Sequence, residues 1–151
     1  MSDPVMLPPE RHLVRRPPGI FIPPLLIFPF LVYNLIAFLV FGGSPDGWSN
    51  ILFTVPMVSG EQWALTAGDL MLVVSLAVLF FEVVKSTQSG RSSVLEHMLS
   101  TLVFILFLVE FLLVGASASS VFFILMVMAL FDVVAGFTVS ITSAGRDVTM
   151  G

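Results

Sequence analysis

The stretch LMVMALFDVVAGFTVSI, residues 125–141, decides the fold class of this chain. Asp132 is its only charged residue, and the apolar run around it is long enough to cross a bilayer as a helix, which takes roughly 20 residues. Three further apolar runs of comparable length occur in the sequence. We therefore expect four membrane spans, over residues 24–41, 64–84, 98–114 and 120–142.

The composition supports the same class. Hydrophobic residues make up 57% of the 151 residues, charged residues 11%, and 15 residues are phenylalanine. A soluble domain with this composition would expose large apolar patches. Backbone groups in lipid must be paired internally, and the apolar runs show no period-two alternation, so we predict helices and not a barrel. The expected fold is an all-α membrane protein, a four-helix bundle over residues 24–143.

The basic residues predict the orientation of the bundle. All six lie before the first span, between the second and third, or after the fourth: Arg11, Arg15, Arg16, Lys85, Arg91 and Arg146. The connections 42–63 and 115–119 contain no lysine or arginine. The positive-inside rule then places both termini in the cytoplasm. The chain also has no cysteine and therefore no disulfide framework, which fits a bacterial inner membrane.

The first outer loop, between the first two predicted spans, is more than a simple turn. Its segment ILFTVPMV, residues 51–58, is apolar but too short to span, so we expect it to lie along the membrane interface or to re-enter the bundle. Ser59 and Gln62 have the spacing of a capping box, which predicts that the second helix begins near Gly60.

Polar segments are expected at both ends of the chain. Residues 1–23 form a Pro-rich cytoplasmic arm, and residues 144–151 form a short cytoplasmic tail. Tryptophan and basic side chains favour the headgroup region of the bilayer. Five residues are expected as anchors there: Arg15, Arg16, Trp48, Trp63 and Lys85.

Four acidic residues fall inside the predicted spans: Asp69, Glu82, Glu110 and Asp132. A charged side chain at membrane depth costs about 2.5–3.5 kcal/mol on insertion scales, so such residues usually face protein, pair with another group, or carry protons. Asp132 is expected near the midplane, Asp69 and Glu110 in the outer leaflet, and Glu82 near the inner surface. Glu82 should pair with Lys85 at i,i+3. The candidate partners of the two outer acids are Tyr33, Asn34 and Ser75.

Small and polar residues recur at helical spacing along two of the predicted spans. They are Ala129, Asp132, Gly136, Ser140 and Ser143 in the fourth span, and Ala64, Gly68, Ser75 and Glu82 in the second. Small residues let helices approach closely, so these stripes should face protein and not lipid. Two interpretations stay open. The stripes either line a path for protons or cations, or they form a packing face whose acids are held by neighbouring side chains.

No motif in the sequence identifies a reaction. Nucleotide-binding, metalloprotease and hydrolase fingerprints are missing, and the water-exposed charges are balanced, so we expect no enzymatic activity, no cofactor, no metal and no nucleic-acid partner. The two histidines, His12 and His97, are expected in or beside cytoplasmic polar regions.

Two functions remain open at the level of the sequence. The first is an oligomeric channel or transporter for protons or small cations, with Asp132 as the central site, Asp69 and Glu110 at the outer mouth, and Glu82 at the inner mouth. The second is a non-catalytic accessory subunit that docks on a larger inner-membrane complex. Both functions place the chain in the lipid bilayer, either as a homo-oligomer or as part of a larger assembly.

Overall fold

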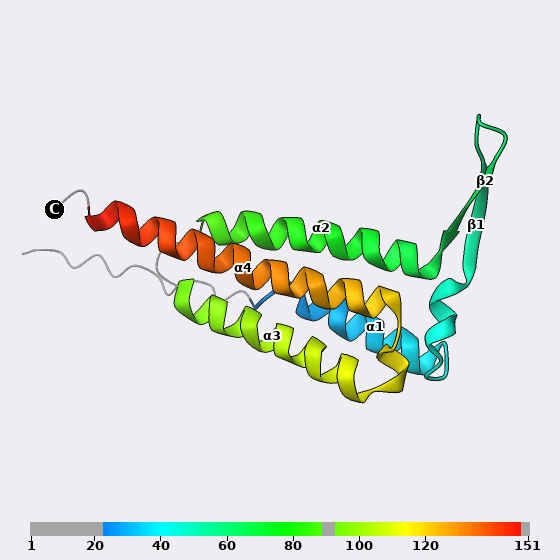
Figure 1. Ribbon diagram of the computed structural model, residues 1–151, viewed down its shortest axis with the longest axis horizontal. Helices are drawn as coiled ribbons and strands as arrows, with labels where there is room; N and C mark the ends of the chain where they lie inside the picture. The colour runs from blue at the N-terminus through cyan, green and yellow to red at the C-terminus, as the bar shows by residue number, and fades with distance from the viewer. Residues whose placement is uncertain (1–22, 89–92, 149–151) are drawn as a thin grey trace, which may run out of the picture.

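Four helices run alternately in opposite directions and form one elongated bundle (Figure 1). In chain order they are α1 (Ile27–Leu39), α2 (Ala67–Gln88), α3 (Ser93–Leu113) and α4 (Ser120–Val148). The computed structural model describes residues 23–88 and 93–148, of which residues 87, 88, 93, 94, 139, 140 and 142–148 are described by their backbone alone. α4 packs against both α2 and α3 and is the central element of the bundle.

Short elements gather at one end of the bundle, which we call the hairpin end (Figure 1). They are the 3-10 helices η1 (Pro45–Ser49) and η2 (Gly115–Ser117) and the antiparallel strands β1 (Ile51–Pro56) and β2 (Gln62–Thr66). The opposite end, where α2 ends and α3 begins, is called the tail end. The fold is therefore mostly helical, and the expectation of an all-α protein is corrected by one two-stranded sheet.

The prediction of long apolar helices is confirmed for three of the four spans. α2, α3 and α4 each contain an apolar stretch of 19 or 20 residues that is long enough to cross a membrane. Large apolar side chains on their outer faces are exposed, for example Phe80 at 65% and Phe131 at 61%. The backbone of α4 stays helical to Val148, beyond the predicted end at residue 142, because helical hydrogen bonds do not require apolar side chains.

The first predicted span is shorter than expected. Its helix, α1, has 13 residues, which corresponds to about 20 Å of the roughly 30 Å that a spanning helix must cover. Two prolines precede it, and Gly42 and Gly43 follow it with positive φ angles of 61° and 84°. The backbone N–H of Gly43 bonds to the carbonyl of Ala37 over 2.8 Å, so the chain turns away directly after α1.

Residues 51–58 do not re-enter the bundle. Residues 51–56 form β1, which pairs with β2 in a hairpin whose turn contains Gly60 at a φ of 89°. The hairpin projects sideways from the bundle, and β1 is exposed along its whole length (Figure 1). The expectation of a re-entrant segment is wrong, because these residues have a neighbouring strand available for hydrogen bonding outside the bundle.

The second helix begins later than the sequence predicts, and with a different cap. Gln62 lies in β2, so Ser59 and Gln62 form no capping box. Thr66 and Asp69 form one instead: Asp69 N–H donates to Thr66 Oγ1 over 3.1 Å, and the Asp69 carboxylate accepts from Thr66 N–H and Oγ1 over 2.9 and 2.7 Å. This reciprocal pair fixes the start of α2 at Ala67.

Aromatic side chains fill the core near the hairpin end. Tyr33 of α1 stacks on Trp48 of η1 with ring centroids 4.5 Å apart, and it meets Phe122 of α4 edge-on at 4.7 Å. Trp48 is only 3% exposed and packs in this aromatic core, so its role as a headgroup anchor stays a prediction. Trp63, by contrast, is exposed on β2.

Candidate functional site

Glu110 of α3 is held by two donors near the hairpin end. Asn34 Nδ2 of α1 donates to Oε2 over 3.0 Å, and Ser117 Oγ of η2 donates to Oε1 over 2.6 Å. Asn34 also donates to the carbonyl of Phe30, which fixes its amide relative to α1. Glu110 therefore ties α1, which is distant in the sequence, to α3 and to η2, which directly follows α3. Asn34 is one of the partners that the sequence proposes for this acid.

Tyr33, another proposed partner of the outer acids, bonds elsewhere. Its hydroxyl donates to the carbonyl of Ala116 over 3.0 Å and lies 2.7 Å from Ser119 Oγ. Ser119 Oγ also accepts from the backbone N–H of Phe122 over 3.1 Å, so it caps the start of α4. The result is a second connection between α1 and the turn that joins α3 to α4.

Glu82 of α2 lies toward the tail end and is only 4% exposed. Its Oε1 accepts from Lys85 Nζ over 2.9 Å, the i,i+3 ion pair that the spacing predicts. Its Oε2 accepts from the backbone N–H of Leu25 over 2.9 Å. Lys85 Nζ also lies 3.4 Å from the carbonyl of Pro23. Since Leu25 lies just before α1, Glu82 supplies the negative charge that a helix N-terminus favours.

Asp132 of α4 is 5% exposed and faces the interior of the bundle. Ser100 of α3 lies close to its carboxyl group, and Glu82 and Lys85 of α2 are near enough to interact with it electrostatically. The sequence separates Asp132 at the midplane from Glu82 near the inner surface. In the folded bundle the two carboxyl groups belong to one cluster, which is completed by Lys85 and Ser100 and spans α2, α3 and α4.

Asp69 makes its hydrogen bonds separately from the other three acids. It is exposed at the start of α2, and both its backbone N–H and its carboxylate are bonded to Thr66. Asp69 and Glu110, which the sequence groups as an outer pair, share no partner in these hydrogen bonds. The folded chain thus brings together Glu82 and Asp132 and leaves Asp69 and Glu110 in separate interactions.

The described small residues of the two stripes lie at helix contacts, except Ala64, which lies in β2 and not on α2 because the helix begins only at Ala67. A Cβ atom on Gly68 of α2 would come within 2.7 Å of Val121 of α4, and a Cβ atom on Gly136 of α4 would collide with the imidazole of His97. Ser75 is fully buried and donates to the carbonyl of Met71 on its own helix, and Ala129 is 1% exposed. The side chains of Ser140 and Ser143 and the residues Arg15 and Arg16 lie outside the described part of the chain.

Among the cavities lined by described residues are three that none of the buried carboxylates lines. Two of them, each about 360 Å³, open near the start of α4, one beside Phe111 and the other beside Trp48. The third, about 90 Å³, is an almost entirely apolar groove between α1 and α2. Within residues 23–88 and 93–148, no group of three histidine or acidic side chains is placed to hold a metal ion.

Sequence reasoning missed four contributors to these contacts. Ser117 and Ser119 lie in a five-residue connection that reads as a simple turn of small residues, and Ser100 lies among apolar residues of α3. Ser117 follows Glu110 by seven residues, and a hydroxyl that close in the sequence to an intramembrane acid could have been predicted as its hydrogen-bond donor. His97, which the sequence places in or beside a cytoplasmic polar region, stacks its ring on Phe137 with centroids 5.7 Å apart, a contact that the sequence does not indicate.

The chain matches no protein-family model, no curated protein and no solved structure. Its class is therefore defined by its own fold and buried polar groups. Three of its helices are long and apolar enough to cross a membrane, and they carry buried carboxylates that are bonded to neighbouring elements. These features support a helical membrane protein.

Proposed function

We propose that this protein is a non-catalytic structural subunit of a larger membrane assembly. Its buried carboxylates hold the helices of the bundle together by hydrogen bonds. One observation carries the proposal: two of the three buried or half-buried acids on the long helices are hydrogen-bonded to groups from other elements, and the third faces a hydroxyl of a neighbouring helix. Glu110 bonds to Asn34 and Ser117, Glu82 bonds to Leu25, and Asp132 lies close to Ser100.

The bonding pattern explains why acids are retained at this depth. α1 is too short to gain the backbone and packing stability of a full span, and carboxylates tie its two halves to the rest of the bundle. Glu82 bonds to the backbone just before α1, and Glu110 bonds to Asn34 in its second half. A carboxylate committed to a fixed donor is poorly suited to release and rebind a proton or an ion, and it is well suited to specify one packing.

The orientation and membrane are part of the same proposal. The basic residues support both termini on the cytoplasmic side, and the absence of cysteine fits a bacterial inner membrane. The test is the size of the protein in its own membrane. A tagged copy extracted from native membranes in mild detergent should run in a native gel as a larger species than the same chain produced alone. Equal sizes in the two preparations would remove the support for an assembly.

A second candidate function is the transport of protons or small cations, by the chain alone or as a homo-oligomer. It is favoured by one observation: Asp132, Glu82 and Lys85 place three ionisable groups in one buried cluster. Clusters of this kind occur in proton pathways of membrane proteins. Its test is ion flux into liposomes that contain the purified protein, with Asp132→Asn as the variant that should lose the flux.

A further inference from the structure

The β1–β2 hairpin has one strongly apolar face. Directly opposed residues of an antiparallel pair lie on the same side of the sheet, and residues two apart along a strand share that side. The register pairs Phe53 with Leu65 and Val55 with Trp63. These four large apolar side chains, which we call the aromatic face, therefore lie together.

The opposite face of the hairpin has a different character. There the register pairs Thr54 with Ala64 and Pro56 with Gln62, and beyond a register shift it pairs Ile51 with Thr66. Ile51 is large and apolar but lies at the base of the hairpin, whereas the other side chains of this face are small or polar. Between the register shift and the turn the hairpin is thus amphipathic across its two faces, which is the pattern expected of a strand pair with one face in water and the other against an apolar partner.

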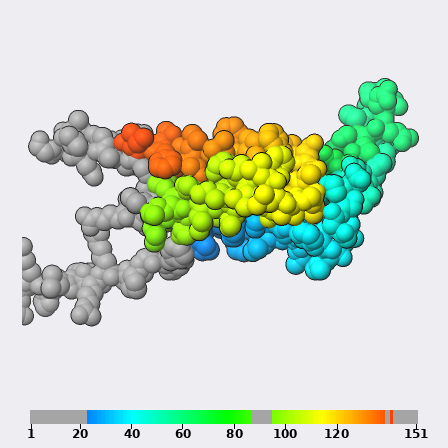
Figure 2. Space-filling view, turned by 60° about the horizontal axis from the view of Figure 1, so that its bottom comes forward, coloured from blue at the N-terminus to red at the C-terminus, as the bar shows by residue number. Residues whose placement is uncertain are grey.

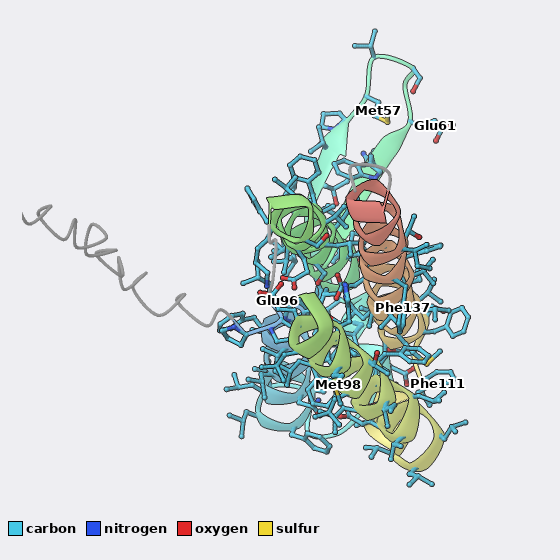
Figure 3. All side chains as sticks on the ribbon, turned by 90° about the vertical axis from the view of Figure 1, so that its left-hand side faces the viewer. Met57, Glu61, Glu96, Met98, Phe111 and Phe137 are labelled. Carbon is cyan, nitrogen blue, oxygen red and sulfur yellow. The ribbon has the colours of Figure 1, made fainter. Side chains whose placement is uncertain are left out.

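The bundle does not cover the aromatic face. Phe53 is 53% exposed, Val55 41% and Trp63 49%. Figure 2 shows the hairpin standing clear of the helices. In Figure 3, which looks along the bundle, Met57 and Glu61 mark the tip of the hairpin well outside the helices. An apolar partner from outside the described chain is needed to bury these side chains.

We infer that the aromatic face rests on the surface of the lipid bilayer at the hairpin end. The first argument is continuity. β2 passes into α2 without a connecting loop, since Thr66 is followed directly by Ala67. α2 is one of the helices that can cross a membrane, and its exposed surface is apolar. A hairpin that leaves the end of a spanning helix sideways, as Figure 1 shows, extends along the plane of the bilayer.

The second argument comes from charge and backbone polarity. Residues 51–66 contain one charged side chain, Glu61 at the turn, and no basic one. The hairpin therefore binds the bilayer through apolar contacts and through Trp63, since tryptophan prefers the boundary between headgroups and acyl chains. The outer edges of the two strands carry backbone groups without strand partners, which must reach water. The hairpin consequently lies at the boundary and not in the hydrocarbon core, and zwitterionic lipid is sufficient to hold it.

A pair of neighbouring single-cysteine variants tests this inference, because the chain has no cysteine of its own. Val55→Cys lies on the aromatic face and Thr54→Cys on the opposite face, and both sites are exposed. Each variant is labelled with a nitroxide and placed at one copy per phosphatidylcholine nanodisc. Collision with oxygen, which concentrates in lipid, is compared with collision with a water-soluble nickel chelate. The ratio of oxygen to nickel accessibility should be higher at residue 55 than at residue 54.

Two results would overturn the inference. Equal ratios, with both labels open to the nickel chelate, would place the whole hairpin in water. A label at residue 55 that is shielded from both reagents, with spin–spin broadening in discs that hold two copies, would assign the aromatic face to a second copy of the chain. Helicity of the two variants, measured by circular dichroism, controls for folding. The result is independent of the proposed structural role, since that role concerns acids inside the bundle.

Discussion

Asn34 of α1 donates a hydrogen bond to Glu110 of α3 over 3.0 Å, although 76 positions separate the two residues in the chain. The same carboxylate is held by Ser117 at its other oxygen. α1 is the shortest of the four helices, so a polar bond to a long neighbour contributes a larger share of its attachment. Replacing these few polar side chains should therefore change the stability of the bundle by a measurable amount.

The bond between Asn34 and Glu110 predicts a coupling energy. Asn34→Ala and Glu110→Ala should each destabilise the bundle, and the double variant should be less destabilised than the sum of the two. Coupling energies between helices in membrane proteins are about 0.6 kcal/mol on average and reach about 1.7. The measurement is unfolding in mixed micelles with increasing SDS, followed by circular dichroism. Asn50→Ala, at an exposed position, is the control and should change stability little.

The ion pair of Glu82 and Lys85 predicts an asymmetry between single and double replacement. Glu82→Leu removes the carboxylate that accepts from the ammonium of Lys85 and from the N–H of Leu25, and breaking one side of a buried pair costs about 3–5 kcal/mol. Glu82→Leu combined with Lys85→Leu should be more stable than Glu82→Leu alone, because the ammonium that lost its carboxylate is removed as well. A double variant as unstable as the single one in the same SDS titration would contradict this role of the pair.

The contact between Gly136 and His97 predicts a steric effect with a rescue. Gly136→Ala should destabilise the packing of α3 on α4 by about 1–3 kcal/mol, the usual cost of overpacking. His97→Ala in the same chain should recover part of that loss by removing the colliding ring. Gly115→Ala is the matched control, because a Cβ atom there meets nothing within 4 Å. Equal thermal stability of the two glycine variants in detergent would show that the stripe tolerates larger side chains.

The distribution of basic residues predicts which side of the membrane the hairpin occupies. Ser59→Cys, in the exposed turn between the strands, should react with a membrane-impermeant maleimide added to intact cells. Ser2→Cys, in the predicted cytoplasmic arm, should react only after the membrane is permeabilised. The reverse pattern of labelling would invert the topology, and labelling of both sites in intact cells would exclude a single orientation.

The long helices were predictable because each needs only a local signal, an apolar run of roughly 20 residues. The pairing of Glu82 with Lys85 was predictable for the same reason, since three residues along one helix bring two side chains together. Asn34 was proposed as a partner of an outer acid because it lies at a similar depth. In each case the prediction needs only the position of a residue along its own helix, and that position can be counted in the sequence.

The hairpin and the cluster at Asp132 depend on contacts that the sequence does not display. Residues 62–66 adjoin the apolar run of α2, so the sequence predicts them as the beginning of that helix. In the structure they pair with β1 instead. Ser100 reads as an isolated polar residue in an apolar helix, and only the packing of α3 on α4 brings it to Asp132. Distances between separate helices, and therefore the grouping of the acids, come from tertiary packing.

The most direct test of the account is proton flux through the purified protein. Wild type and Asp132→Asn are each reconstituted in liposomes that enclose a pH-sensitive dye, and a potassium diffusion potential is imposed with valinomycin. If the buried carboxylates serve to hold the bundle together, both proteins should give the same flux as liposomes without protein, and the variant should differ only in its stability. A flux in wild type that exceeds the protein-free level and is lost in Asp132→Asn would contradict the structural role and establish transport.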